Sequence, residues 1–234
     1  MKIGLESNKH YSLIYKKEFM KSLVKVILYL LGFLVAKVFN VKWAHKFKML
    51  HRYLYTYWVI QNFKRTGRNV IIGSFQYLRE PDKIVLGDNV AIGQHCIFEL
   101  YSSYGDQRFT PFLSLGNNSS IGDYSHITCI NRICIGNNVL MGRKVFITDN
   151  AHGASDYKLM GVPPNLRPLY SKGPVIIEDN VWVGEMVCIM PGVTIGKCSI
   201  IGANAVVTKD IPPYSVVVGP NATIKKTIKK IGLN

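Results

Sequence analysis

From Val175 to Thr208, aliphatic and small side chains recur every six residues. The first set lies at Val175, Val181, Val187, Val193, Ser199 and Ala205, and a second set lies two residues later, at Ile177, Val183, Ile189, Ile195, Ile201 and Val207. An α-helix repeats about every 3.6 residues and a strand about every 2, so neither explains an uninterrupted six. A hexapeptide period is typical of a parallel β-helix, in which each unit forms one flat side of a triangular coil.

The same register predicts five coils whose inward side chains stack into one continuous core. These inward residues are Leu86, Ile92 and Phe98; Leu115, Ile121 and Ile127; Ile135, Met141 and Ile147; Ile177, Val183 and Ile189; and Ile195, Ile201 and Val207. Asparagines follow inward aliphatics by three residues, at Asn89, Asn118, Asn138, Asn180 and Asn204. Because asparagine tolerates the left-handed backbone conformation, we expect these residues at the corners of the coils.

Charge is concentrated outside the coils. Residues 1–70 hold 14 Lys and Arg against only Glu6 and Glu18, whereas residues 71–210 hold 11 basic and 12 acidic residues. The repeat therefore predicts a β-helix domain over 70–224, preceded by a basic segment over 1–69 and followed by a basic tail over 225–234. The charge accompanies no nucleic-acid motif, so we expect no nucleic-acid partner.

Two helices are expected in the basic segment. Leu23 to Val38 is apolar nearly all round, but its uncharged stretch, Val26 to Ala36, is shorter than the roughly 20 residues of a spanning helix. A second pattern steps by three and four through Trp43, Phe47, Leu50, Leu54, Tyr57 and Gln61. A basic amphipathic helix rich in Trp and Tyr is typical of an anionic membrane surface. The alternative is a helical cap that covers the open end of the β-helix.

The cysteines and histidines lack the spacing of a metal site, so no metal is expected. Five cysteines form no CxxC pair, and no apolar stretch followed by a small-residue cleavage site is visible near the N-terminus. We therefore expect reduced, structural thiols in a cytosolic protein. Peripheral attachment at the inner face of the cell membrane is compatible with this location.

The loop over 148–174, which interrupts the coils, holds the candidate chemistry. It begins Thr148-Asp149-Asn150-Ala151-His152-Gly153. A histidine beside a carboxylate at the root of a loop has the composition of a general base, although a loop-stabilising histidine is the alternative. Asp149 would orient the imidazole, or else serve only as a corner residue. His126 and His95 are interpreted as side chains on the coil surface.

Three runs carry a resemblance to a known family: Ile177-Glu178-Asp179-Asn180-Val181-Trp182-Val183-Gly184, Pro191-Gly192-Val193-Thr194-Ile195-Gly196, and residues 201–213. They resemble the C-terminal signature of the hexapeptide-repeat acyltransferases, most closely the O-acetyltransferases of maltose, galactoside and surface polysaccharides. The resemblance covers roughly residues 70–225. It implies an all-β, left-handed parallel β-helix with an N-terminal helical segment, a homotrimer, and acetyl-CoA as donor.

The resemblance also implies roles for single residues. It places the catalytic histidine at His152, a tryptophan near the acetyl-transfer site at Trp182, and a backbone position near the pantetheine arm at Ala203. Thr208 and Lys209 match positions beside the adenine and its phosphates. Gly184 is a candidate to donate its backbone amide to the oxyanion.

Two departures from the family pattern concern the cofactor. Glu185 replaces a small residue that can contact coenzyme A, and Gly219-Pro220-Asn221-Ala222 exchanges the Pro and Asn of the family's closing pattern.

The function expected is direct O-acetylation of a sugar hydroxyl in a bacterial surface polysaccharide or its precursor, within a ternary complex. The alternative enzyme N-acetylates a nucleotide-linked amino sugar or a small-molecule amine. A third class has two members. One is a non-enzymatic trimeric scaffold, which would lack this chemistry. The other is a carbonic-anhydrase-like relative, which would need a histidine metal cluster.

Overall fold

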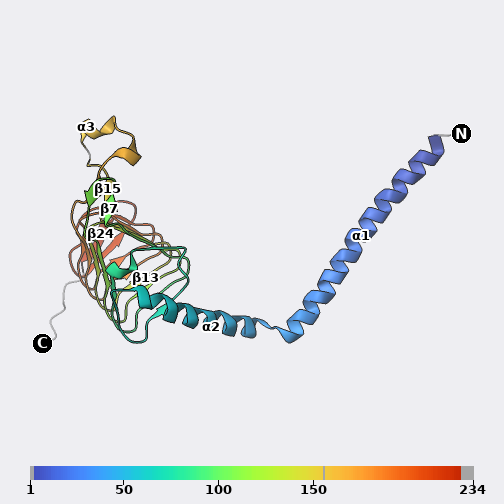
Figure 1. The fold of residues 1–234 in the computed structure, drawn as a ribbon, viewed down its shortest axis with the longest axis horizontal. Helices are drawn as coiled ribbons and strands as arrows, with labels where there is room; N and C mark the ends of the chain where they lie inside the picture. Colours follow the sequence, from blue (N-terminus) through green and yellow to red (C-terminus); the bar gives the residue numbers. More distant parts are fainter. Residues whose placement is uncertain (1–2, 155, 228–234) are drawn as a thin grey trace. The chain divides into compact units, whose positions relative to one another are not determined.

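The computed structural model describes residues 3–154 and 156–227, which form two compact units, one within residues 1–51 and one from Arg52 onward. Of the expected basic tail, residues 228–234 lie outside the described residues. The second unit is a parallel β-helix whose strands make three sheets (Figure 1).

We name the three sheets face A, face B and face C, in the order in which the chain visits them. Face A contains β1 (Arg65–Thr66), β4 (Ile84–Leu86), β9 (Phe112–Leu115), β12 (Arg132–Ile135), β17 (Val175–Ile177) and β20 (Thr194–Ile195). Face B contains β2 (Ile71–Ile72), β5 (Ala91–Ile92), β10 (Ser120–Ile121), β13 (Leu140–Met141), β18 (Trp182–Val183), β21 (Ile200–Ile201), β23 (Ser215–Val218) and β24 (Thr223–Thr227). Face C contains β3 (Tyr77–Arg79), β6 (Ile97–Leu100), β11 (His126–Cys129), β14 (Phe146–Thr148), β19 (Cys188–Ile189) and β22 (Val206–Val207).

The strand register confirms the predicted coils. Ile121 pairs with Met141 across 20 residues, whereas Val183 pairs with Ile201 across 18, which explains the two-residue shift in the sequence pattern. Every predicted inward aliphatic is buried in one core cluster. A further coil, formed by β1, β2 and β3, precedes the five and places Ile72 beneath Ile92.

The corners depend on backbone conformation and on close approach between coils. All five predicted asparagines have positive φ, between 55° and 59°. Their amides form a ladder, in which Asn118 donates to Asn138 at 3.1 Å and accepts from Asn89 at 2.8 Å. Glycine serves a different purpose: a Cβ at Gly116 would meet the backbone carbonyl of Gly136 at 2.6 Å. The repeated Asn and Gly positions therefore fix how closely the coils stack.

The N-terminal segment is helical, as predicted. It consists of α1 (Ile3–Val38) and α2 (Val41–Val59), and Asn40 caps α2 by accepting from the Trp43 amide at 3.2 Å. Lys16–Lys37 is long and apolar enough to span a membrane by length and composition alone. The expectation that this helix is too short was wrong, because the apolar window extends beyond Val26–Ala36. A signal sequence meets the same criterion, so the helix assigns no location by itself.

The last turns of α2 cover the first coil. Thr56 is buried and its hydroxyl accepts from the Ile72 amide at 2.9 Å, while Arg52 donates to the Ile92 carbonyl at 3.0 Å. Val59 and Phe63 join the core cluster. The residues that form this cover differ from the predicted stripe, since Leu54 and Tyr57 are exposed.

Two segments interrupt the regular coils: the first insertion, between β6 and β9, and the second insertion, between β14 and β17, which corresponds to the loop predicted over 148–174. An antiparallel ribbon projects from each insertion. The first insertion forms β7 (Ser103–Tyr104) and β8 (Gln107–Arg108), and the second forms β15 (Ala151–His152) and β16 (Leu169–Tyr170) with the short helix α3 (Tyr157–Met160). The remaining elements are 3₁₀ helices at Ile60–Asn62, Pro81–Lys83 and Pro164–Leu166. In Figure 1, β7 and β15 lie close together at one side of the β-helix.

Candidate active site

His152 lies where the second insertion leaves the end of β14. It pairs with Leu169 across the β15–β16 ribbon, and the Gly153 amide donates to the Pro168 carbonyl at 2.8 Å. Gly153 has φ +83°, which glycine adopts without steric strain and which turns the chain immediately after the histidine. The imidazole is exposed and makes no hydrogen bond within residues 3–154 and 156–227. Its ring meets that of Tyr104 edge-on.

The imidazole borders a cavity of about 360 Å³ on the outer surface of face C, here called the His152 cavity. Its lining residues are Glu99, Tyr101, Tyr104, His126, Thr128, Phe146, Thr148, Asn150, Ala151, His152, Leu169 and Met190. Apolar rings and convergent polar groups of this kind are typical of a small-molecule site. The cavity is therefore the best-supported place for chemistry on a polar organic substrate.

A histidine–carboxylate pair in this cavity escaped the sequence analysis. The His126 Nε2 atom lies 2.9 Å from the Glu99 Oε2 atom, and the Tyr101 hydroxyl donates to Glu99 Oε1 at 3.0 Å. Burial, together with the hydrogen bond to Glu99, raises the pKa of Tyr101 to about 12. His126 was correctly expected on the coil surface, but that surface is the floor of the cavity. The outward position of Glu99, paired in register beside β11, is the signal that could have found it.

Asp149 is fully buried and is held by the chain that turns after β11. Its carboxylate accepts from the amides of Ile130 at 2.9 Å and Asn131 at 2.8 Å, and from the Cys129 thiol at 3.1 Å. Burial beside this carboxylate raises the pKa of Cys129 far above its ordinary value. These contacts support the corner role of Asp149. Its orienting role toward His152 stays a prediction without a recorded contact.

Thr208 and Lys209 lie at the same corner as the root of the loop, two coils further on. A cavity of about 270 Å³, the middle cavity, shares Ala151 and Met190 with the His152 cavity and reaches Thr208. A third cavity of about 510 Å³, the Lys209 cavity, also includes Thr208. The shared residues make one run of hollows from His152 to Lys209.

The other predicted cofactor residues lie on a different face. Trp182, Gly184 and Ala203 line a cavity of about 490 Å³ on face B, together with Glu185. A single chain therefore brings these three residues together but does not bring them to His152. The Gly184 amide donates to the Ile201 carbonyl at 2.7 Å, so it already has a partner in the coil ladder. Its suggested role in stabilising an oxyanion stays a prediction, which this hydrogen bond does not support.

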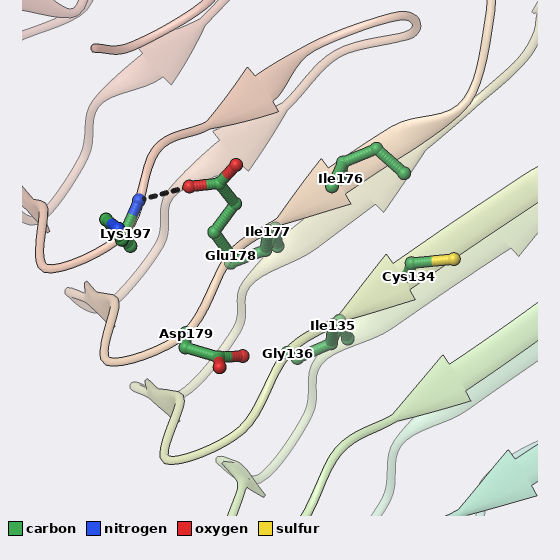
Figure 2. A pocket seen from close by; sticks show the side chains of 8 residues that line it. All are labelled: Cys134, Ile135, Gly136, Ile176, Ile177, Glu178, Asp179 and Lys197. Atoms are coloured by element: carbon green, nitrogen blue, oxygen red, sulfur yellow. Dashed lines mark hydrogen bonds between the residues drawn. The ribbon is translucent and has the colours of Figure 1, made fainter. Parts of the chain in front are cut away.

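A further hollow on face A contains none of the predicted site residues (Figure 2). Its polar side chains hold the corners: Glu178 accepts from the Lys197 amide at 2.8 Å, and Asp179 accepts from the Asn137 amide at 2.7 Å. These bonds join successive coils. The hollow is accordingly explained as a structural part of the repeat. Within the described residues, no group of three or more His, Cys, Asp or Glu side chains could hold a metal ion.

The sequence of this chain is similar to those of known transferases. Residues 174–209 match the family described as bacterial transferase hexapeptide (six repeats). WbbJ of Escherichia coli (strain K12), whose name assigns it to O-acetyl transfer in lipopolysaccharide biosynthesis, is 35% identical over 154 residues, covering 64% of this chain and 74% of WbbJ. C18B11.09c of Schizosaccharomyces pombe, named as an acetyltransferase, is 59% identical over 58 residues, which cover 25% of this chain and 27% of C18B11.09c.

A solved structure shares the fold. AntD, an N-acyltransferase from Bacillus cereus in complex with dTDP-4-amino-4,6-dideoxyglucose and coenzyme A, has a TM-score of 0.60 at 23% identity, covering 72% of this chain and 86% of AntD. The matches to the family model and to WbbJ confirm the predicted family and acetyltransferase class, and the fold shared with AntD confirms the predicted β-helix. The chain belongs to the hexapeptide-repeat acetyltransferases.

Proposed function

We propose that this protein transfers the acetyl group of acetyl-CoA to a hydroxyl of a sugar in a bacterial surface polysaccharide or its precursor. The observation that carries the proposal is the run of adjoining cavities from His152 to Lys209, in which the His152 cavity and the middle cavity share Ala151, the neighbour of His152. We take the His152 cavity as the acceptor pocket and the other two cavities as the donor groove. The 35% identity to WbbJ supports a hydroxyl of a surface glycan as the acceptor.

His152 acts as the general base in this proposal. Its imidazole removes the proton of the acceptor hydroxyl while the oxygen attacks the carbonyl carbon of the thioester. The tetrahedral intermediate collapses by breaking the carbon–sulfur bond, and the imidazolium returns the proton to the sulfur of coenzyme A. Transfer is direct, because the lining of the His152 cavity, which lies wholly within the described residues, includes no cysteine that could form an acyl-enzyme.

The acceptor pocket suits a sugar ring. The His126–Glu99 pair presents a donor and an acceptor side by side, which matches neighbouring hydroxyls of a carbohydrate. The rings of Phe146 and Tyr104 supply apolar surface for the C–H face of the sugar. We therefore assign sugar recognition to face C and acetyl transfer to its corner with the loop.

The donor groove requires a second copy of the chain. Lys209 is exposed at the far end of the run, where its ammonium would meet a phosphate of coenzyme A. Trp182 and Ala203 are predicted to contact the same cofactor from face B. A homotrimer resolves this separation, because face B of one copy would complete the groove at the corner of the next.

The N-terminal segment gives the enzyme its proposed location, at the inner face of the cytoplasmic membrane. The apolar side chains between Lys25 and Lys37 are exposed, and basic residues precede them at Lys16, Lys17 and Lys21. An apolar helix flanked by lysines suits insertion beside anionic headgroups. Lipid-linked glycans assembled there would be within reach of the acceptor pocket.

The experiment that tests this function offers radiolabelled acetyl-CoA with a panel of nitrophenyl glycosides of neutral hexoses and their amino-sugar counterparts. We expect label on the neutral sugars as an ester that mild alkali releases. Alkali-stable label confined to the amino sugars would support N-acetylation instead, which the AntD fold and the Glu99 carboxylate accommodate. Absence of label from every sugar would contradict the proposal.

A further inference from the structure

The ribbon that carries His152 is too small to hold the imidazole by itself. Strands β15 and β16 contribute only two residue pairs, Ala151 with Tyr170 and His152 with Leu169. An isolated two-stranded ribbon is marginally stable in water even when longer. A general base, in contrast, must be held within about 0.5 Å of its productive position relative to the substrate. Some other part of the chain must therefore fix the ribbon.

Gln107, in the first insertion, makes the strongest contact with this ribbon. Its side-chain amide donates to the Leu169 carbonyl at 3.0 Å, and its side-chain carbonyl accepts from the Leu169 amide at 2.7 Å. The carboxamide thus occupies both backbone groups of the residue directly opposite His152, as a neighbouring strand would. Leu169 is also buried, so an unpaired amide or carbonyl at this position would be costly.

Tyr104, from the same hairpin as Gln107, contacts both the second insertion and the imidazole of His152. Its hydroxyl donates to the Asn165 carbonyl at 2.7 Å. Its ring meets the His152 imidazole with centroids 5.6 Å apart and an interplanar angle of 70°. The two contacts restrict both the loop backbone and the side-chain rotation of His152.

The hairpin is itself anchored to the coils, so it can transmit their rigidity. The Ser102 amide and hydroxyl both donate to the Glu80 carboxylate, and the Tyr101 amide donates to the Cys129 carbonyl at 2.9 Å. The Phe109 amide closes the hairpin by donating to the Ser102 carbonyl at 2.9 Å. A rigid connection therefore runs from the coils, through the hairpin, to the ribbon of His152.

We infer that Gln107 is a positioning residue that holds His152 in its reactive geometry, with Tyr104 limiting the rotation of the imidazole. The inference rests on the proposed role of His152 and adds a function for the insertion between Tyr101 and Phe112. The insertion is a brace for the catalytic loop, and the repeat alone would leave His152 on an unsupported ribbon.

The test compares Gln107→Ala and Gln107→Glu with the control Arg108→Ala in the full-length protein. Arg108 is exposed, and among the described residues its guanidinium donates only to carbonyls of its own hairpin, those of Gly105 and Gln107. Steady-state kinetics use acetyl-CoA and the best sugar of the nitrophenyl panel. Because a small misplacement of a catalytic group strongly lowers the reaction rate, we expect kcat to fall about 10- to 100-fold for Gln107→Ala. KM for acetyl-CoA should stay within twofold, and Arg108→Ala should match wild type.

Gln107→Glu keeps an acceptor for the Leu169 amide but loses the donor to its carbonyl, so a fall of about tenfold is expected. Hydrogen exchange supplies a readout that needs no acceptor: peptides covering residues 166–171 should exchange at least about tenfold faster in both Gln107 variants. Exchange at wild-type rates, or unchanged kcat with faster exchange, would overturn the inference while leaving the proposed function standing. If wild type labels no sugar, the proposed function fails first and the inference fails with it.

Discussion

The imidazole of His152 and the ring of Tyr104 meet edge-on, with centroids 5.6 Å apart, although the two residues are 48 positions apart in the sequence. Each residue lies on a different insertion between regular coils. The stacked strands bring the two insertions to one end of face C, where they meet over the Glu99–His126 pair. The coils therefore supply rigid spacing, and the interruptions supply the chemistry.

The donor end of the site can be tested at Lys209. We expect Lys209→Glu to raise KM for acetyl-CoA about tenfold or more, because a carboxylate would repel the phosphate that the ammonium attracts. Turnover at saturating acetyl-CoA should change little, since this position is remote from the thioester. The control is Lys226→Glu, because Lys226 is exposed on β24 and does not itself line the Lys209 cavity.

The same titration with 3′-dephospho acetyl-CoA identifies the phosphate. If Lys209 meets the 3′-phosphate, the variant and wild type should differ much less with this donor. Equal effects of the substitution on both donors would exclude Lys209 from that phosphate.

The asparagine ladder makes a prediction about stability. Asn118 combines a φ of +57° with two side-chain hydrogen bonds along the ladder. Asn118→Ala should lower the free energy of unfolding by about 1–2 kcal/mol, because alanine is strained in this conformation and makes neither bond. Asn118→Gly should lose less, since glycine removes the strain. Equal losses for alanine and glycine, measured by denaturant unfolding, would show that backbone conformation is unimportant here.

The buried Cys96 thiol predicts that the free energy of unfolding falls at alkaline pH. Burial is the main cause that raises the pKa of Cys96 from 9.0 to about 11, so the folded protein holds the thiol proton more tightly than the unfolded chain. The resulting stabilisation is fully present below pH 9 and is lost as pH rises towards 11, a change of about 3 kcal/mol at most.

The measurement is the urea midpoint of wild type and Cys96→Ala between pH 8 and 11. The midpoint of the variant should fall less steeply with pH, whereas Cys134→Ala, which removes a partly exposed thiol, should follow wild type. Parallel curves for wild type and Cys96→Ala would contradict the prediction.

The proposed membrane contact can be separated from the cap alternative by two truncations. Full-length protein should sediment with anionic vesicles at low salt and be partly released at high salt, leaving a fraction held by the apolar helix. Removing residues 1–39 should abolish sedimentation without loss of solubility.

Removing residues 1–63 should instead cause aggregation, because Thr56, Val59 and Phe63 cover the first coil. If the full-length protein did not sediment with anionic vesicles at any salt concentration, the membrane proposal would be contradicted. Covering the first coil would then be the remaining role of the N-terminal segment.

Periodicity made the coils predictable and left the site largely unpredicted. Inward residues such as Ile121 and Met141 were found because a stacked core demands an aliphatic at a fixed interval. The first coil was missed because Thr66 occupies an inward position in place of an aliphatic residue.

The contacts of the insertions follow no period, so sequence alone could not pair Gln107 with Leu169. His152 was found by its composition at the root of a loop and by family resemblance. The hydrogen-bond partners of Asp149 and of the Gly184 amide depend on the folded backbone, so the sequence could not predict them. The suggested chemical roles of both residues stay predictions.

The most direct test of the account is the turnover of His152→Ala with labelled acetyl-CoA and the best sugar of the panel, beside binding of acetyl-CoA to the same variant. Loss of a positioned general base should lower kcat by about 10² to 10⁴ while the affinity for acetyl-CoA and the unfolding midpoint stay near wild type. Near wild-type turnover at saturating acetyl-CoA would show that His152 does not remove the acceptor proton.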